Sequence, residues 1–223
     1  MAMQFRDRRD AGRRLAARLM AYAGRPAVLV LALPRGGVPV AFEIATALHT
    51  PLDVFLVRKL GVPGHRELAM GAIATGNELV LNEEVIRTLG ITPDLVDMVA
   101  AEEQRELQRR ERAYRDDRPP PSVQGRVVIL VDDGLATGAT MLAAATAVRS
   151  LQPSRLVVAV PVASPETCNE FRAKVDEIIC AKTPEPFYAV GFWYEDFEQI
   201  ADDEVRELLA LAARTHPSTT GPS

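Results

Sequence analysis

The sequence predicts an α/β protein, in which a mainly parallel, twisted β-sheet is flanked by helices. Apolar runs rich in Val, Leu and Ile recur along the chain, at residues 27–33, 127–131 and 155–162. A continuous apolar run between turn residues is typical of a strand that is buried on both faces, as in a parallel sheet. Each run is followed by a turn and then by a helical pattern, which can supply the right-handed crossover that parallel strands require.

The composition fits one domain over residues 1–223, because 48% hydrophobic residues easily supply a packed core. The net charge of −4 does not favour nucleic-acid binding. We find no apolar run of about 18 residues, so a membrane span is not expected, and the charged segment 1–14 is unlike a secretory signal. We therefore expect a cytoplasmic protein, in which the isolated Cys168 and Cys180 are free thiols.

Asp7 is placed to cap a first helix that runs to about Tyr22. Its basic residues are expected to form a solvated face: Arg8, Arg9, Arg13, Arg14 and Arg18. The strand 27–33 then enters the turn Pro-Arg-Gly-Gly at 34–37, followed by a helix over 38–49. A third strand, 52–57, delivers Arg58 and Lys59 to the carboxyl edge of the sheet, where ligands of open α/β sheets collect.

The next segment reads as a loop, a hairpin and two helices. His65, Arg66 and Glu67 are predicted to lie in a flexible loop, where an acid or base could close over a reacting centre, or could simply be an ordinary exposed loop residue. Residues 69–75 and 78–82 form a hairpin around Gly76-Asn77. Residues 83–89 form a short helix, and Thr92-Pro93 begins a long, highly charged one that ends near Tyr114. We interpret 82–117 as an inserted helical arm, which is solvated or packs on a partner.

The C-terminal part continues the alternation and then changes character. Strands at 155–162 and 175–180 flank a helix that begins at Ser164-Pro165. Residues 183–200 are predicted to form a hood, or flap, that stacks on a planar base; a hydrophobic subcore or a dimer contact is the alternative. This segment gathers Phe187, Tyr188, Phe192, Trp193, Tyr194 and Phe197. A last helix spans 202–214, and 215–223 is predicted to be a disordered tail.

The most informative stretch is 127–141, where a buried strand ends in Asp132 and Asp133. The loop that follows, 134–140, offers backbone N–H groups, hydroxyls and a helix N-terminus, which together suit a phosphate. The two carboxylates make sense if they bind something attached to that phosphate, such as a pair of sugar hydroxyls. A P-loop is excluded because Ala139, not lysine, follows Gly138, and the dinucleotide fingerprint is absent. A purely structural turn has little reason to hold two adjacent carboxylates at a buried strand end.

The run Asp-Asp-Gly-Leu-Ala-Thr-Gly-Ala-Thr-Met at 132–141 resembles the phosphoribosyl-pyrophosphate (PRPP) motif of type I phosphoribosyltransferases, most of all the adenine enzymes. The resemblance implies that Asp132 and Asp133 bind the ribose hydroxyls and accompany Mg²⁺ as its ligands. It implies that the loop holds the 5′-phosphate through Gly134, Leu135, Ala136, Thr137, Gly138, Ala139 and Thr140. It also implies the type I fold, with a C-terminal hood in which Tyr188 stacks on the base.

Cations and glycines complete the predicted site. A pyrophosphate carries several negative charges, which cations aimed at it stabilise as it leaves. The residues expected to face it are Arg35, Gly36, Gly37, Arg58 and Lys59, and the catalytic candidates are Arg35, Lys59, Glu67, Asp132 and Asp133.

The sequence therefore predicts a phosphoribosyltransferase that transfers ribose 5-phosphate from PRPP to a small nitrogenous, nucleobase-like acceptor and releases pyrophosphate, and we expect a homodimer. The acceptor stays open, because Ala136 stands where the hypoxanthine-guanine enzymes carry an acid and Ala74 aligns with the loop glutamate of the adenine enzymes. The alternatives are a non-catalytic PRPP- or nucleotide-sensing regulator on the same fold, and an adaptor whose charged arm binds a partner.

Overall fold

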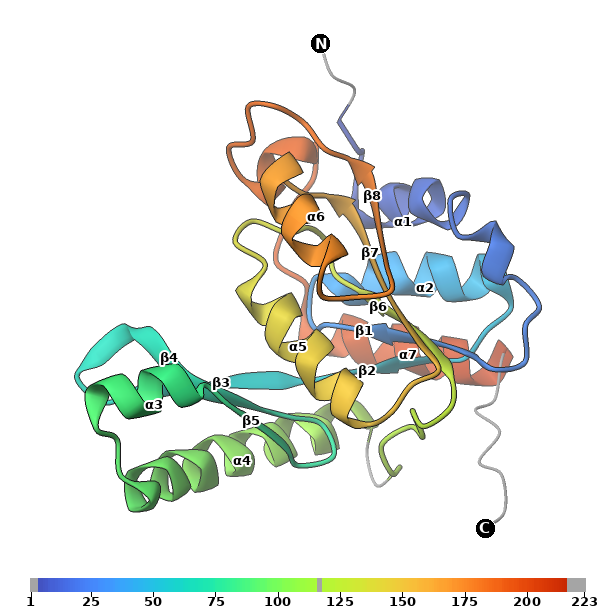
Figure 1. Cartoon of the computed structure of the whole chain (residues 1–223). Coiled ribbons are helices and arrows are strands. Elements are labelled where there is room, and N and C mark those ends of the chain that lie inside the picture. The colour runs from blue at the N-terminus through green and yellow to red at the C-terminus, as the bar shows by residue number, and fades with distance from the viewer. Residues whose placement is uncertain (1–3, 116–117, 216–223) are drawn as a thin grey trace.

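The computed structural model describes residues 4–115 and 118–215, with the side chains of residues 66 and 67 excepted. The body is a five-stranded sheet in the order β2-β1-β6-β7-β8, and every neighbouring pair is parallel (Figure 1). The strands are β1 (Val28–Ala32), β2 (Leu52–Val54), β6 (Val127–Val131), β7 (Arg155–Val162) and β8 (Glu177–Lys182). Across the described ranges, no helix is long and apolar enough to cross a membrane.

Helices cover both faces of this sheet. All five residues of β1 are buried, because successive side chains point to opposite faces and each face carries helices. Val28 and Val30 pack with α1 (Arg8–Ala16), α2 (Gly37–Leu48) and α7 (Asp202–Thr215). Leu29 and Leu31 pack in the opposite layer with α5 (Ala139–Ser150) and α6 (Pro165–Arg172). The predicted fold class, an α/β protein with a mainly parallel sheet flanked by helices, is confirmed.

A second, antiparallel sheet projects from this body, in the order β3-β4-β5 (Figure 1). Its strands are β3 (Val57–Val62), β4 (His65–Ala74) and β5 (Glu78–Leu81), and α3 (Glu83–Leu89) and α4 (Pro93–Arg115) follow. Leu60, Met70 and Val96 share a buried cluster between sheet and helices. The predicted hairpin around Gly76-Asn77 is confirmed, and the φ values of these residues are 82° and 63°. Its loop holds three residues rather than two, Thr75, Gly76 and Asn77, because Ala74 pairs with Glu78.

Two expectations about this region are wrong. The predicted loop at His65 belongs to β4, because the chain reverses tightly at Gly64, φ 81°, and places His65 opposite Val62. The predicted strand 52–57 is divided between β2, which ends at Val54, and β3, which begins at Val57, so Arg58 and Lys59 lie within β3 rather than beyond the end of a parallel strand.

Smaller corrections concern the chain ends and the cysteines. Asp7 caps the first helix as predicted, but α1 ends at Ala16, and a separate 3₁₀ turn, η1 (Met20–Tyr22), brings the Tyr22 hydroxyl to within 2.5 Å of Glu177 Oε2. Cys168 and Cys180 are not free thiols, because they are joined in a disulfide between α6 and β8. Thr215 ends α7, and residues 216–223 of the predicted tail lie outside the described residues.

Candidate active site

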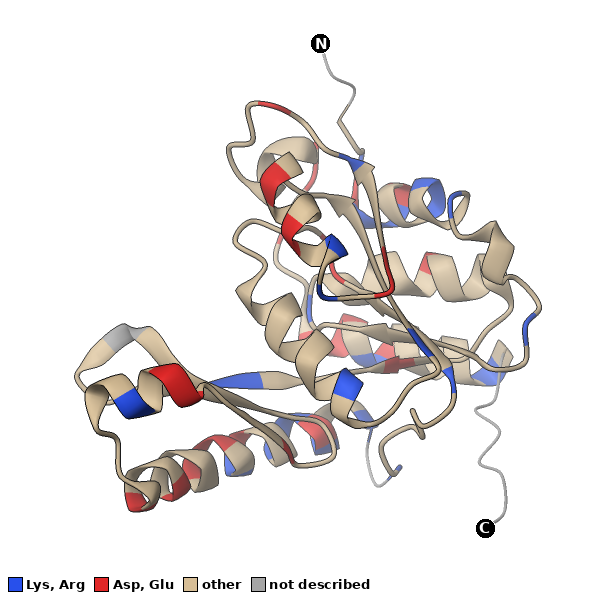
Figure 2. Cartoon of the chain, viewed as in Figure 1, with Lys and Arg blue, Asp and Glu red and all other residues tan. Residues whose placement is uncertain are grey.

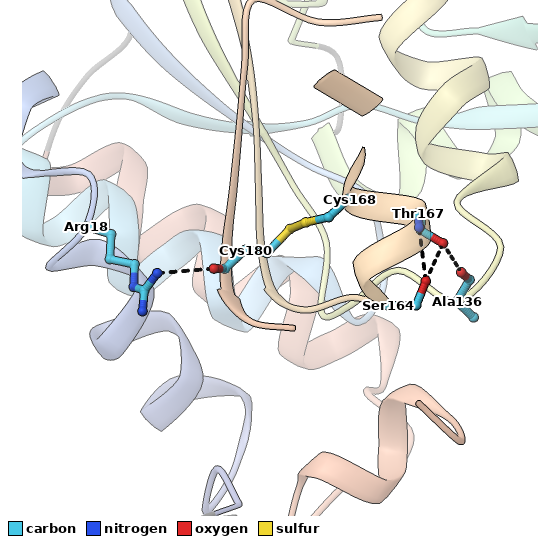
Figure 3. The surroundings of a disulfide bond; sticks show 6 residues. All are labelled: Arg18, Ala136, Ser164, Thr167, Cys168 and Cys180. Carbon is cyan, nitrogen blue, oxygen red and sulfur yellow. Dashed lines mark hydrogen bonds between the residues drawn. A yellow bond between two sulfur atoms is a disulfide. The ribbon is translucent and has the colours of Figure 1, made fainter. Parts of the chain in front are cut away.

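The loop after β6 lies across the carboxyl ends of the parallel strands. The Leu135 N–H donates to Val162 O of β7 at 2.9 Å, which draws the loop over the neighbouring strand. Gly138 then caps α5 with φ +69°, a left-handed backbone that suits glycine. The Thr167 hydroxyl of α6 also donates to Ala136 O of the loop, at 2.8 Å (Figure 3). The loop is therefore fixed by contacts from both β7 and α6.

A cavity of about 200 Å³ opens on this loop. Its wall combines the predicted loop with one basic residue of β3, the carboxylate Asp132 and one residue of segment 183–200, the predicted hood. The lining residues are Lys59, Asp132, Gly134, Leu135, Ala136, Thr137, Gly138, Ala139, Thr140, Met141 and Val190. The start of α5 faces the cavity, so backbone N–H groups and the helix dipole favour an anion there. Lys59 adds a positive charge from the projecting sheet.

The turn at the end of β1 lies directly under the two carboxylates. A Cβ placed on Gly36 would lie 2.0 Å from Asp133 Oδ2, and one on Gly37 would lie 2.7 Å from Val131 O. Since real Cβ atoms do not approach so closely, glycine at both positions lets the β1 turn and the β6 turn touch. The structure thus brings Gly36, Gly37, Asp132 and Asp133 together, as the sequence predicted.

Asp133 is held by residues from the first helix and the hood. Arg8 Nε donates to Asp133 Oδ2 at 2.8 Å, and the Tyr194 hydroxyl donates to Asp133 O at 2.5 Å. Arg8 also donates to Glu198 O at 2.7 Å, and its guanidinium lies 3.9 Å from the centroid of the Phe197 ring. The expectation that Arg8 belongs to the solvated face is wrong, because it is only 8% exposed.

The spacing of apolar residues in α1 contains a signal for the burial of Arg8 that the sequence-based prediction missed. Arg8 shares a face with the buried Ala11, Gly12 and Leu15, three, four and seven positions later. An arginine on an apolar face needs a buried partner, but its partner lies 125 residues away in the chain.

Burial raises the pKa of both acids. Desolvation, together with the nearby charge of Asp133, raises the pKa of Asp132. Desolvation also raises the pKa of Asp133, while the hydrogen bond from Arg8 acts in the opposite direction. A ligand that donates hydrogen bonds from its hydroxyl groups, or that brings positive charge, would therefore stabilise the ionised form of this pair.

Two of the predicted cations point at carboxylates rather than into the cavity. Arg35 NH1 lies 3.8 Å from Asp202 Oδ1 at the start of α7, and Arg58 pairs with Glu103 of α4 at 2.5 Å. Figure 2 shows acidic and basic residues along α4, which brings such charges close to the basic segment of β3. The Tyr114 hydroxyl donates to Asp202 at 2.6 Å, and burial raises the pKa of Tyr114 to about 12. Lys59 is the predicted cation that lines the cavity.

With this geometry established, comparison with known proteins identifies the family. The family model "Phosphoribosyl transferase domain" matches residues 4–193, which is most of the chain. The chain belongs to the phosphoribosyl transferase domain family. The predicted resemblance is thereby confirmed.

Relatives agree with this assignment. The crystal structure of TT1426 from Thermus thermophilus is 46% identical, covers 93% of this chain and 98% of its own, and superposes with a TM-score of 0.83. Two Mycobacterium tuberculosis proteins, "Putative phosphoribosyl transferase MT0597" of strain CDC 1551 / Oshkosh and "Putative phosphoribosyl transferase Rv0571c" of strain H37Rv, are each 47% identical over 94% of this chain. The chain spans 47% of the length of these two relatives.

Two residues of the predicted site stay predictions. The Glu67 side chain lies outside the described residues. Tyr188 is 68% exposed and its ring lies 5.3 Å from that of Phe192. The hood residue that lines the cavity is Val190, whose Cγ1 would lie 2.5 Å from a Cβ on Gly134.

The donor set of this site fits Mg²⁺ that is shared with a substrate. In the part of the chain that the structure describes, no group of three or more His, Cys, Asp or Glu side chains could hold a metal ion. Mg²⁺ usually takes only one or two carboxylates and completes its shell with water and substrate phosphate oxygens. Asp132 in the cavity wall and Asp133 beside it supply that number of carboxylates.

Proposed function

We propose that this phosphoribosyl transferase domain transfers the ribose 5-phosphate group of PRPP to a small nitrogenous, nucleobase-like acceptor and releases pyrophosphate. The observation that carries the proposal is one cavity in which Asp132, the N-terminus of α5 and Lys59 meet. A helix N-terminus suits a phosphate, a carboxylate suits sugar hydroxyls, and a lysine suits the charge of a leaving pyrophosphate. PRPP presents these three groups on one molecule.

Each group then has a role in the transfer. Residues 134–140 bind the 5′-phosphate, and Asp132 with Asp133 binds the ribose hydroxyls, which holds the anomeric carbon in place. Lys59 faces the pyrophosphate, and Gly36 and Gly37 let the β1 turn approach it. When the acceptor nitrogen attacks the anomeric carbon, the bond to pyrophosphate breaks and its electron pair leaves with pyrophosphate. The protein contributes position and charge rather than a covalent bond.

Mg²⁺ belongs to this proposal as a companion of PRPP. Asp132 and Asp133 would hold it, and it would supply positive charge to the pyrophosphate oxygens. Arg35 and Arg58 are further candidates for the pyrophosphate, and each would have to exchange its present carboxylate partner, Asp202 or Glu103, for the ligand.

Calorimetry with PRPP and Mg²⁺ tests the donor half of the proposal. The wild type should bind PRPP, and an Asp132→Asn/Asp133→Asn variant should bind it at least ~10-fold more weakly, because hydrogen bonds to charged groups are lost. An Asp94→Asn/Asp97→Asn variant removes two exposed carboxylates of α4 and serves as the matched control. Unchanged affinity in the first variant would sink the assignment.

One observation favours the non-catalytic sensor as a second candidate. Ala136 stands where the hypoxanthine-guanine enzymes carry an acid, and Asp132 and Lys59 are the titratable side chains in the cavity wall. Pyrophosphate release from PRPP with a panel of purine, pyrimidine and nicotinate-type bases separates the two functions. Release with one base identifies a transferase and its acceptor, whereas tight PRPP binding without release from any base favours the sensor. Size-exclusion chromatography of the same sample tests the expected homodimer.

A further inference from the structure

We propose that Arg8 is a positioning residue of the ligand site, which fixes the Asp133 carboxylate for the ribose hydroxyls. The inference rests on the proposed role of Asp133 as a ribose-binding residue. It adds a residue from α1, far from the motif in the sequence, to the ligand-binding machinery.

The first argument is the cost of burying Arg8. Its side chain is 9% exposed and that of Asp133 is 15% exposed. Removing two charges from water is expensive, and it is tolerated only where the geometry is good and further hydrogen bonds are made. Arg8 meets that requirement with Asp133 Oδ2, Glu198 O and the face of the Phe197 ring.

The second argument is the contrast with the neighbouring arginines of α1. Arg9 and Arg13 both pair with Glu43, and their side chains are 49% and 46% exposed. Such exposed pairs contribute little to stability. Arg8 therefore differs from them in burial and in the partner it takes, which is a carboxylate of the proposed site.

The third argument is how closely Asp133 is confined. Oδ2 lies between Arg8 Nε and the backbone of Gly36, where even a Cβ would come within 2.0 Å. Its main-chain carbonyl accepts from the Tyr194 hydroxyl of the hood. Arg8 thus limits rotation of the carboxylate before a ligand arrives, and a preorganised group loses less entropy on binding.

The test compares ligands that use Asp133 with one that does not. Calorimetry is run on full-length wild type, Arg8→Met, Arg8→Lys and the matched control Arg9→Met, with PRPP, ribose 5-phosphate and pyrophosphate. Arg8→Met should weaken the binding of PRPP and of ribose 5-phosphate about 10-fold and leave the affinity for pyrophosphate unchanged. Arg8→Lys should restore part of the loss, because it keeps the charge, and Arg9→Met should match wild type.

A second variant keeps the test decisive if Arg8→Met does not fold. Arg8→Met/Asp133→Asn leaves no unpaired charge in the buried pair, and its affinity for ribose 5-phosphate should equal that of Asp133→Asn alone. Wild-type affinity for all three ligands in Arg8→Met overturns the inference, as does equal weakening of all three or a further loss in the double variant. If wild type itself fails to bind PRPP, the proposed function fails and the inference with it; if wild type binds and Arg8→Met matches it, the inference alone fails.

Discussion

Among single residues, Gly36 is the glycine whose backbone lies closest to a carboxylate of the proposed site. Replacing it with alanine would place a Cβ 2.0 Å from Asp133 Oδ2, so the carboxylate must move away from the position that Arg8 gives it. We expect Gly36→Ala to weaken PRPP binding at least ~10-fold, as the loss of a hydrogen bond to a charged group does. Calorimetry measures the change, and Gly61→Ala is the control, because a Cβ there meets nothing within 4 Å. Affinities within twofold of each other would contradict the prediction.

Asp176 should make the stability of the protein depend on pH in the acidic range. Its Oδ2 accepts from Arg149 NH1 at 2.7 Å and from Leu156 N at 2.7 Å, and these bonds, that of Arg149 foremost, lower the pKa of the carboxyl. A depressed native pKa adds stability above the unfolded value of about 3.9, and that stability is lost as the pH falls through the native value. Urea unfolding between about pH 5 and pH 2 should show a shallower decline for Asp176→Asn than for wild type. The effect is modest because the side chain is 38% exposed, and an equal decline in both proteins would refute it.

At the level of single residues, sequence patterns could group the candidate residues that are neighbours in the chain. Asp132, Asp133 and the loop up to Thr140 are contiguous, so one motif is enough to place them together. Arg8 could not be found in the same way, since it acts on Asp133 across 125 residues of chain. The partners of Arg35 and Arg58, Asp202 and Glu103, were missed for the same reason.

Among the elements, α6 supports the loop that is proposed to bind the 5′-phosphate. Thr167 of α6 holds Ala136 O, and the next residue, Cys168, is joined to Cys180 of β8 (Figure 3). The disulfide closes a short loop, with a sequence separation of 12, and such cross-links stabilise mainly by restricting the unfolded chain. We expect a Cys168→Ser/Cys180→Ser variant to lose about 2–3 kcal/mol of unfolding free energy.

Urea unfolding with and without dithiothreitol measures this loss. Reductant should bring the wild-type curve toward that of the double serine variant and leave the variant itself unchanged. The prediction would be contradicted if thiol titration of denatured wild type, without reductant, found two free thiols and if its urea unfolding curve did not respond to reductant.

The elements also show where sequence patterns predict well. Parallel strands bury both faces, so β1, β6 and β7 appear as continuous apolar runs that are hard to misread. The β3–β4 hairpin contains polar residues at Arg58, Lys59 and His65, and its strand character comes from the partner strand and the cluster around Leu60. Pairing of that kind depends on tertiary contacts, so the segment at 65–67 looked like a loop.

Considered as a whole, the molecule does not separate into a body and an independent arm. Leu107 and Tyr114 of α4 belong to the same buried cluster as β1 and α2. Arg115, at the end of α4, is 1% exposed and binds Asp53, Glu111 and the Val54 carbonyl. The helical arm therefore shares its core and a buried ion pair with the parallel sheet.

It follows that arm and body should unfold together, and that Arg115→Met should destabilise both. Removing one partner of a buried ion pair leaves Asp53 uncompensated, which costs about 3–5 kcal/mol. Arg109→Met is the control on the same helix, because the Arg109 side chain is 70% exposed.

Trp193, the only tryptophan of the sequence, reports on the hood by fluorescence, and far-UV circular dichroism reports on all helices, α4 included. The two signals should give one coincident urea transition, shifted to lower urea in Arg115→Met alone. A separate early transition seen only by circular dichroism would show that α4 unfolds on its own, and the shared core would then not couple the arm to the sheet.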